Sequence, residues 1–200
     1  MSNNLLIIFV RNRVRGKVKT RLAATIGPDK ALEVYLLLLE RTMEVTRPLA
    51  LDKTVFFSDT LENGGTWETG DYGKKVQQGE GLGERMAAAF AAAFAEGYQR
   101  VGIIGSDCYE LTPDILRQAF QQLEEKDLVI GPSTDGGYYF LGMTRFFPDL
   151  FRNKTWSSPT VLRDTLADAQ SLQLQMALLP QLTDVDEEKD LATIPGFNAG

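Results

Sequence analysis

The stretch VGIIGSDCYELT, residues Val101–Thr112, decides the fold. Its apolar run stops at a small residue and an acid, which is the pattern of a buried strand that delivers Asp107 to its end. Central parallel strands are buried on both faces, so ionisable groups normally follow the strand, at the edge where α/β folds bind ligands. Thr112 and Pro113 then supply an N-cap and a first helical residue, so a helix begins at once. We therefore expect Asp107 in a tight strand-to-helix turn, either as a functional carboxylate or as a cap of that turn.

Strands and helices alternate on both sides of this stretch. Apolar runs and helical periodicity predict strands at Leu5–Val10, Lys53–Asp59 and Leu128–Gly131, helices at Pro28–Thr46 and Pro113–Glu125, and a half-exposed strand at Leu172–Met176. A further helix should open at Ser158-Pro159-Thr160. This order predicts a three-layer α/β/α sandwich with a mostly parallel, mixed central sheet, in one domain that spans residues 1–200.

The composition limits the chemistry. A hydrophobic fraction of 44% and a charged fraction of 24% describe an ordinary globular protein, and no apolar run approaches the length of a membrane span. We expect a cytoplasmic protein without a membrane partner. The single cysteine and the absence of histidine exclude Ser-His-Asp and Cys-His catalysis and histidine-ligated metals. The groups that remain available for catalysis are carboxylates, Lys, Arg and Tyr, together with the hard cations Mg²⁺ or Mn²⁺. The net charge of −6 argues against nucleic acid as the partner.

A basic segment follows the first predicted strand. Every odd position from Arg11 to Arg21 is a base, Gly16 lies among them, and no acid interrupts. The segment holds six of the 21 Lys and Arg residues of an acidic protein. A glycine-containing basic loop between a strand and a helix is a common phosphate site, so we expect Arg11, Lys19 and Arg21 to bind an anion. The alternative is a solvated loop that aids solubility.

Two further segments carry glycines. Gly81 and Gly83 precede Arg85 and an alanine-rich helix, where they allow either close approach of a ligand or a simple turn. Asp135-Gly136-Gly137-Tyr138 is a turn that leads into an aromatic, strand-forming run. Asp135 is either a turn residue or a group that meets a substrate.

Two acids stand near the end of the chain. Asp184 and Asp186 are two residues apart in an extended segment, so their side chains share a face. If they converge with Asp107 and the basic loop, they offer carboxylates for a divalent metal and cations for phosphoryl oxygens. The interpretation is a phosphate site with a metal at Asp107, Asp184 and Asp186.

The same motifs resemble a known family. Lys19-Thr20-Arg21-Leu22, Gly81–Met86, Gly105-Ser106-Asp107-Cys108, Asp135–Tyr138 and Asp184-Val185-Asp186 look like the nucleotide-diphospho-sugar transferases of the glycosyltransferase-A fold. Within that superfamily the chain resembles small bacterial glycosyltransferase-like proteins associated with arsenosugar biosynthesis. It is similar, more distantly, to guanylyltransferases that activate phospholactate or molybdopterin. Arg13, Arg15 and Tyr109 depart from this pattern, because the family usually has proline there.

The resemblance implies a mixed seven-stranded sheet, a nucleotide bound by the N-terminal half and Mg²⁺ or Mn²⁺ on Asp107 with help from Asp184 and Asp186. It predicts a transferase that moves a sugar from a nucleoside-diphosphate sugar to a small acceptor. Arg11, Gly16, Lys19, Arg21, Gly81, Gly83 and Arg85 are the expected nucleotide-binding residues, and Asp135, Gly136, Gly137 and Tyr138 the substrate-binding ones, with Asp107 and Asp135 as catalytic residues. The alternatives are a nucleotidyltransferase that releases pyrophosphate and a nucleotide-binding module without catalysis. The sequence does not indicate an oligomeric state.

Overall fold

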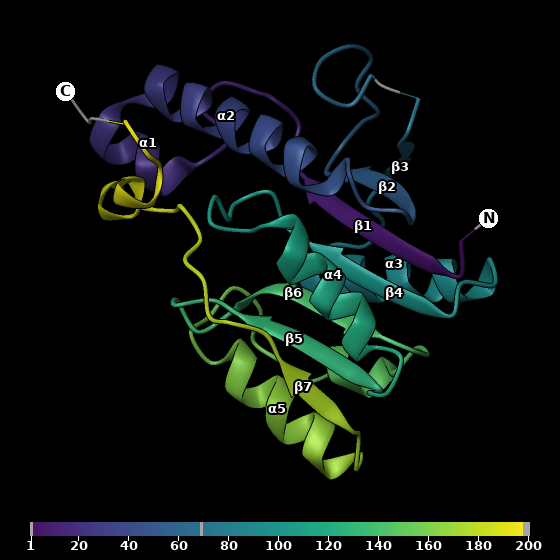
Figure 1. Cartoon of the computed structure of the whole chain (residues 1–200). Helices are drawn as coiled ribbons and strands as arrows, with labels where there is room; N and C mark the ends of the chain where they lie inside the picture. Colours follow the sequence, from purple (N-terminus) through teal and green to yellow (C-terminus); the bar gives the residue numbers. More distant parts are fainter. Residues whose placement is uncertain (1, 69, 198–200) are drawn as a thin grey trace.

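The computed structural model describes residues 2–68 and 70–197 and contains a seven-stranded sheet (Figure 1). The strand order is β3-β2-β1-β4-β6-β5-β7. Strand β6 pairs antiparallel with β4 and β5, and the other pairs are parallel. The bounds are β1 Asn4–Val10, β2 Asp52–Phe57, β3 Gly73–Val76, β4 Arg100–Ile104, β5 Leu128–Pro132, β6 Tyr138–Met143 and β7 Met176–Leu178. The predicted mixed, mostly parallel sheet is confirmed.

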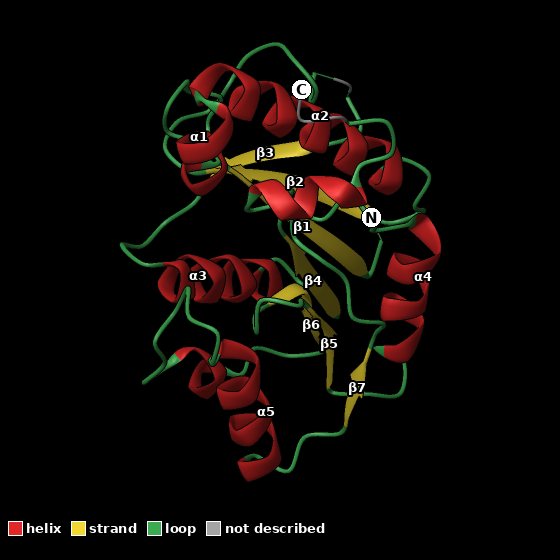
Figure 2. Cartoon of the chain, turned by 90° about the vertical axis from the view of Figure 1, so that its left-hand side faces the viewer, coloured by secondary structure: helices red, strands yellow, loops and turns green. Residues whose placement is uncertain are grey.

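Helices cover both faces of the sheet. Figure 2 shows α3 and α5 on one side and α4 on the other, and buried contacts place α2 on the same side as α4. The bounds are α1 Thr20–Ile26, α2 Pro28–Thr46, α3 Leu82–Ala95, α4 Pro113–Gln122 and α5 Val161–Ser171, with 3-10 helices η1 Pro148–Phe151 and η2 Glu188–Thr193. The predicted three-layer α/β/α arrangement is confirmed.

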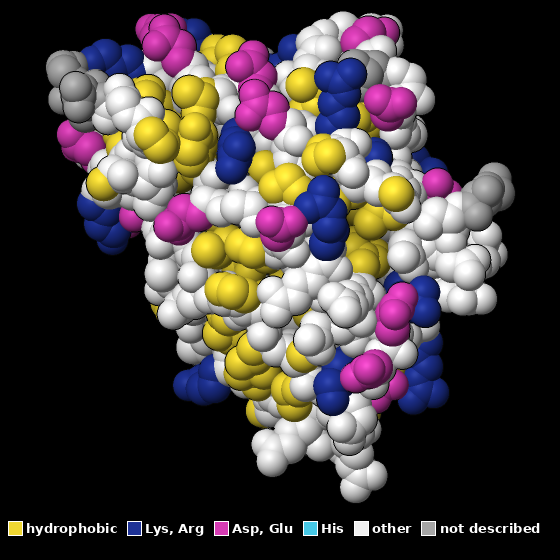
Figure 3. Space-filling model, in the orientation of Figure 1, with side chains coloured by type: hydrophobic (Ala, Val, Ile, Leu, Met, Phe, Trp, Pro, Cys, Tyr) yellow, Lys and Arg dark blue, Asp and Glu magenta, His cyan; other side chains and the backbone are white. Residues whose placement is uncertain are grey.

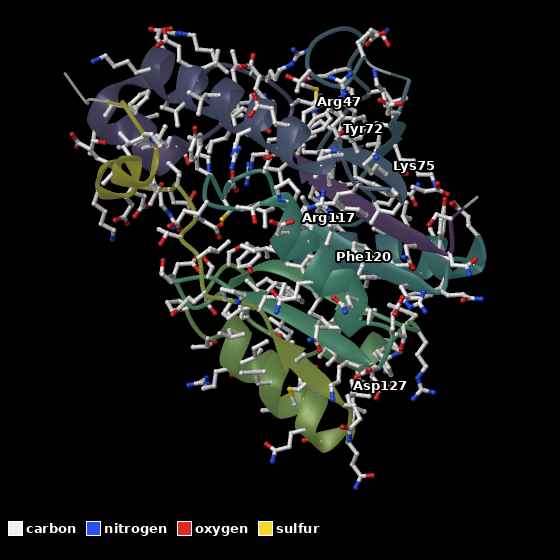
Figure 4. The ribbon with its side chains drawn as sticks, in the orientation of Figure 1. Arg47, Tyr72, Lys75, Arg117, Phe120 and Asp127 are labelled. Carbon is white, nitrogen blue, oxygen red and sulfur yellow. The ribbon has the colours of Figure 1, made fainter. Side chains whose placement is uncertain are left out.

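Strand β1 shows how the sequence produces these layers. Successive side chains of a strand point to opposite faces. Ile8 accordingly packs with Tyr35 of α2 and Phe120 of α4, the last labelled in Figure 4. Ile7 packs on the other face with Phe90 of α3. All of these side chains are at least 94% buried, so both faces of the centre of the sheet are dry.

The predictions differ from the structure at several elements. The strand predicted to end at Asp59 ends at Phe57, the helix predicted to end at Glu125 ends at Gln122, and β3 was not predicted. The predicted strand at Leu172–Met176 is wrong, because α5 runs to Ser171 and β7 starts only at Met176. Gln173 takes a left-handed φ of 55°, and the N–H of Leu174 donates to the carbonyl of Ala169 at 3.0 Å. The alternating pattern there reflects a helix end whose Leu174 turns into the core. Helix α1, which the sequence did not reveal, starts at the end of the basic segment.

The C-terminal segment positions the last two acids. After β7 it runs along the carboxyl ends of the strands to η2, beside α1 (Figure 1). Leu182 forms a parallel bridge with Ser133, and the N–H of Val185 donates to the carbonyl of Asp107 at 2.9 Å. These bonds bring residues that are far apart in sequence to the end of β4.

The surface seen in the orientation of Figure 1 carries charges of both signs. Figure 3 shows Lys and Arg intermixed with Asp and Glu over this surface, without a patch of one sign. Tyr72 fastens the loop before β3 to the end of α2, because its hydroxyl lies 2.9 Å from that of Thr46 (Figure 4). Within residues 2–68 and 70–197, no helix has the length and apolar character of a membrane span.

Candidate active site

A cleft of about 960 Å³ opens at the carboxyl ends of β1 and β4. Its size is at the upper end of the roughly 300–1,000 Å³ of small-molecule sites. Most of the predicted site residues line it, namely Arg11, Lys19, Arg21, Arg85, Asp107, Asp135, Gly137, Tyr138, Asp184 and Asp186. The lining does not include Gly16, Gly81, Gly83 or Gly136. The fold therefore gathers nearly all of the predicted charged groups in one place.

Lys19 joins two of the predicted metal ligands. Its ammonium nitrogen lies 2.6 Å from Oδ1 of Asp107 and 3.3 Å from Oδ1 of Asp186. The Lys19 side chain is only 4% exposed, whereas the two carboxylates are 44% and 40% exposed. Burial alone lowers the pKa of Lys19, but the two neighbouring carboxylates outweigh it and the net pKa is raised. Lys19 is therefore a charged lysine held at the floor of the cleft.

Asp107 is not the cap of the following helix. The side chain of Thr112 takes that role and accepts from the N–H of Ile115 at 3.3 Å, as the sequence predicted. Asp107 contributes its backbone carbonyl to Val185 and its carboxylate to Lys19. The carboxylate is thus directed into the cleft by an ion pair.

Asp184 has a different environment from Asp186. Its Oδ2 accepts from the hydroxyl of Ser133 at 2.9 Å. Burial and the negative charge of Asp107 raise the pKa of Asp184 to about 7, although the bond from Ser133 acts in the opposite direction. A carboxyl whose pKa is raised by an adjacent carboxylate marks a place where a cation would be favourable.

The donor set fits a divalent cation of the phosphate-bridging type. No group of three His, Cys, Asp or Glu side chains in the described part of the chain is placed to hold a metal by itself. Mg²⁺ at phosphate sites commonly needs only one or two carboxylates, and substrate oxygens and water complete its shell. Asp107 and Asp184 supply that pair of carboxylates. Asp107 and Asp186 share the ammonium group of Lys19, and Asp186 also has Arg21 as a second basic partner at 3.6 Å.

The basic segment divides into two groups. Arg13 pairs with Glu62 at 2.5 Å, and Arg15 forms two hydrogen bonds with Asp29 on the surface. These two departures from the family pattern are absent from the lining of the cleft. Arg11 and Lys17 do line it, and the described residues provide neither with a salt bridge. Within the basic segment, the positive charge without a salt bridge therefore comes from Arg11 and Lys17, and Arg85 of α3 also lines the cleft with only neutral hydrogen-bond acceptors.

Two neutral residues, which sequence reasoning missed, hold the start of this segment. The Tyr35 hydroxyl accepts from the N–H of Arg11 and donates to its carbonyl, both at 2.8 Å. Asn12 is 7% exposed, and its amide oxygen accepts from the N–H groups of Asp59 and Thr60. The only sequence signal for Asn12 is an uncharged polar residue between two bases.

Gln77 and Arg85 extend the wall of the cleft next to the ends of β1 and β2. The Gln77 amide donates to the carbonyls of Val10 and Phe56, at 3.2 and 2.9 Å. Its amide oxygen accepts from Arg85, which also donates to the Gly79 carbonyl at 3.0 Å. Arg85 is therefore directed toward the ends of β1, β2 and β3, the side that carries the basic segment.

Two predicted glycines have packing contacts. A Cβ on Gly83 would overlap the indole of Trp156, and one on Gly136, at a φ of +88°, would overlap the carbonyl of Pro159. Asp135 accepts from the N–H of Gly137 at 2.8 Å, so it forms the predicted turn while it also lines the cleft. Trp156 was not predicted as a site residue, and its position before the Ser158-Pro159 helix start was the only signal.

The fold, together with a relative of 32% identity, places the chain in the nucleotide-diphospho-sugar transferase superfamily. The chain belongs to the family described as uncharacterized protein conserved in bacteria (DUF2064), whose profile matches residues 42–158. It is similar to a crystal structure from Desulfovibrio desulfuricans G20 that is provisionally named a nucleotide-diphospho-sugar transferase. The identity is 32%, the match covers 94% of this chain and 84% of the other, and the TM-score is 0.88.

More distant structures share the fold alone. The inositol-1-phosphate CTP transferase from T. maritima is 14% identical over 94% of this chain and 91% of its own, with a TM-score of 0.60. Rv0371c from Mycobacterium tuberculosis H37Rv, in complex with manganese, is 14% identical over 96% of both chains, with a TM-score of 0.57. A search of curated proteins found no match. The predicted superfamily, fold and transferase class are confirmed.

Proposed function

We propose that this protein transfers a sugar from a nucleoside-diphosphate sugar to a small acceptor. One observation carries this proposal: a single cleft holds free bases of the basic segment beside the carboxylates of Asp107 and Asp184. Diphosphate binding requires cations for the phosphoryl oxygens, and the acids beside them fit a bridging metal. The relative from Desulfovibrio desulfuricans, named for the same donor class, supports this choice.

The nucleotide-binding half is the wall formed by the ends of β1, β2 and β3. Arg11 and Lys17, which lack ion pairs within the described residues, bind the diphosphate oxygens. Lys19 is held by Asp107 and Asp186 and offsets their negative charge beside the diphosphate. Arg85 and Gln77 shape the wall for the nucleoside. Positioning and charge neutralisation are the main contributions of such a site to diphosphate chemistry.

A divalent cation on Asp107 and Asp184 would neutralise the diphosphate as it leaves. In the transfer step the acceptor hydroxyl oxygen forms a bond to the anomeric carbon of the sugar. The bond from that carbon to the diphosphate oxygen breaks, and its electron pair leaves with the nucleoside diphosphate. The acceptor proton passes to the carboxylate of Asp135, which orients the hydroxyl.

Nucleotidyl transfer is a second candidate. It would join a nucleoside monophosphate from a triphosphate to a phosphorylated acceptor and release pyrophosphate. The observation in its favour is the number of bases that line the cleft, Arg11, Lys17, Lys19, Arg21 and Arg85, which suits a triphosphate. The fold of the CTP transferase from T. maritima is compatible with either reaction.

A ligand panel tests the proposal. Nucleoside diphosphates, nucleotide sugars and nucleoside triphosphates are compared by thermal shift, with Mn²⁺ and with a chelator. A specific ligand at 100 times its Kd stabilises the folded state by ~2.7 kcal/mol. We expect a nucleotide sugar and its nucleoside diphosphate to raise Tm, and more so with Mn²⁺. Stabilisation by triphosphates alone, with pyrophosphate release, would replace sugar transfer by nucleotidyl transfer, and no stabilisation by any nucleotide would contradict both.

A further inference from the structure

We infer that the acceptor of this transferase is an uncharged alcohol with an apolar or aromatic face, and that it binds against Trp156 in the half of the cleft beyond β4. The inference rests on the proposed function and names the substrate class of the same site. Three observations carry it: the distribution of charge in the cleft, the packing of Trp156, and the character of the neighbouring side chains.

Charge is distributed unevenly across the cleft. Its bases belong to the segment after β1 and to Arg85, which is directed to the Ser58 carbonyl and to Gln77. The lining residues from 135 onward include Asp135, Asp184 and Asp186 and no Lys or Arg. The nearby base Lys154 is 1% exposed and bound to Asp168 at 2.6 Å, so it offers no charge to the cleft. Asp186 faces Lys19 and Arg21, and Asp184 lies at the proposed cation site, but Asp135 has no basic partner among the described residues. A phosphate beside Asp135 would therefore meet a carboxylate without a compensating cation, which is unfavourable.

Trp156 is held rigidly in the part of the cleft that is lined by residues 135 onward. Its ring is nearly parallel to that of Phe151, at an interplanar angle of 11° and a centroid distance of 6.1 Å. Phe151 in turn packs on Phe90 of α3, with centroids 5.8 Å apart. The indole edge lies against Gly83, where any side chain would overlap it. The partly exposed indole that lines the cleft is therefore preorganised, and an aromatic side chain fixed by packing makes a good binding surface at low entropic cost.

Apolar side chains line the cleft together with Trp156, and the polar residues that follow it, Ser157 and Ser158, are uncharged. Leu82, Met86, Tyr138 and Val161 line the same cleft, and Leu82 is 42% exposed. The phenolic oxygen of Tyr138 is buried on the side of Thr165, so Tyr138 offers no hydroxyl group to the cleft. Asp135 is the polar group that would meet the acceptor hydroxyl. This combination of an unpaired carboxylate and an apolar wall selects an alcohol and disfavours its phosphate ester.

The same argument bears on the choice between the two candidate reactions. A nucleotidyltransferase of the second type needs a phosphorylated acceptor, whose anionic oxygen is the nucleophile. The acceptor half of the cleft lacks the cation that would hold such a group. Sugar transfer to a neutral hydroxyl has no such requirement.

A matched pair of probes tests this inference. The probes are 2-phenylethanol and 2-phenylethyl phosphate, which share an apolar body and differ in the phosphate. The chain has two tryptophans, so in Trp67→Phe the fluorescence reports on Trp156 alone. We expect 2-phenylethanol to change this fluorescence at concentrations at least tenfold lower than the phosphate ester does. The same pair is titrated into the wild-type protein by calorimetry, with the donor half saturated by nucleoside diphosphate, so the result does not depend on the folding of one variant.

Two variants complete the test. Trp156→Ala should weaken 2-phenylethanol binding at least tenfold and leave nucleoside diphosphate affinity within twofold, and Trp156→Phe should restore most of the loss. Equal or tighter binding of the phosphate ester, or no binding of the alcohol, would overturn the inference. If nucleoside diphosphates bind and the alcohol does not, only the acceptor class fails. If the alcohol binds Trp156 and no nucleotide binds, the proposed function fails instead.

Discussion

The ammonium group of Lys19 lies between the carboxylates of Asp107 and Asp186, 2.6 Å from the first and 3.3 Å from the second. Lys19 has a left-handed φ of 46°, an uncommon backbone conformation for a residue with a side chain. Such conformations cluster at functional sites, where surrounding contacts maintain them. This ion-pair cluster joins the basic segment, the turn after β4 and the C-terminal segment.

Lys19→Ala should weaken nucleoside diphosphate binding roughly 10- to 100-fold, because a charge-assisted hydrogen bond contributes ~1.5–3 kcal/mol and the two carboxylates would lose their counterion. Titration calorimetry measures the affinity. Arg15→Ala is the matched control, since it removes the same charge from the same segment but from a pair with Asp29 on the surface. Equal losses in both variants would mean that only net charge matters.

Asp107→Asn should preserve the fold and remove most of the metal-dependent activity. The amide keeps the shape of the side chain, and the backbone bond to Val185 is unaffected. Tm and Mn²⁺-dependent sugar transfer are measured on the same preparation. Asp114→Asn, which changes an exposed carboxylate paired with Arg117, serves as the control. Full activity of Asp107→Asn with an unchanged Tm would refute the assigned role of the carboxylate.

Asp184 should make the stability of the metal-free protein depend on pH. Its pKa is about 7 in the folded state and ~3.9 when unfolded, so between these values the folded state binds more protons. The free energy of unfolding therefore falls as pH rises from 4 to 7. Asp184→Asn lacks this loss. The free energy of unfolding of Asp184→Asn, measured relative to that of wild type, should therefore increase by on the order of 1 kcal/mol or more between pH 4.5 and pH 8. A pKa change of one corresponds to ~1.4 kcal/mol.

Urea unfolding of both proteins in a chelating buffer measures that difference. A gap between Asp184→Asn and wild type that stays constant from pH 4.5 to pH 8 would show that Asp184 titrates as an ordinary exposed carboxyl. Added Mn²⁺ should stabilise wild type at pH 8 more than it stabilises the variant.

Arg41 should position the turn that carries Asp107. Its guanidinium donates to the carbonyls of Tyr109 and Leu111, both at 3.2 Å, and lies 5.3 Å from the centroid of the Tyr109 ring. Arg41→Ala should lower stability by ~1–3 kcal/mol and reduce kcat through displacement of Asp107. Urea unfolding and steady-state kinetics measure the two effects.

Tyr109→Phe is the control for that variant. The contacts with Arg41 use the backbone carbonyl and the ring face, so loss of the hydroxyl should leave stability and kcat nearly unchanged. An Arg41→Ala enzyme with wild-type kcat would limit Arg41 to a stabilising role. Either way, the contact explains how Tyr109 is accommodated where the family pattern has proline.

The amino-acid sequence determined the alternation of strands and helices and the placement of Asp107, because apolar runs, helical periodicity and caps are local signals. Pro28–Thr46 was predicted with its exact bounds, and Thr112 was identified as the cap of α4. The strand predicted at Leu172–Met176 failed because the last turn of a helix and a short strand share the same alternating pattern. The sequence also allowed us to predict that the charged groups of the cleft lie together, since residues that follow parallel strands meet at one edge of a sheet.

Only the tertiary structure decided how those charges pair. Six bases at alternate positions look equivalent in the sequence, but Arg13 and Arg15 are neutralised by Glu62 and Asp29, while Lys19 is buried between two carboxylates. Likewise, Gly83 looks like a ligand-binding glycine until Trp156, 73 positions away, is seen against it. Ion pairs and packing contacts between distant segments depend on the route of the chain in space, and local sequence patterns carry no information about that route.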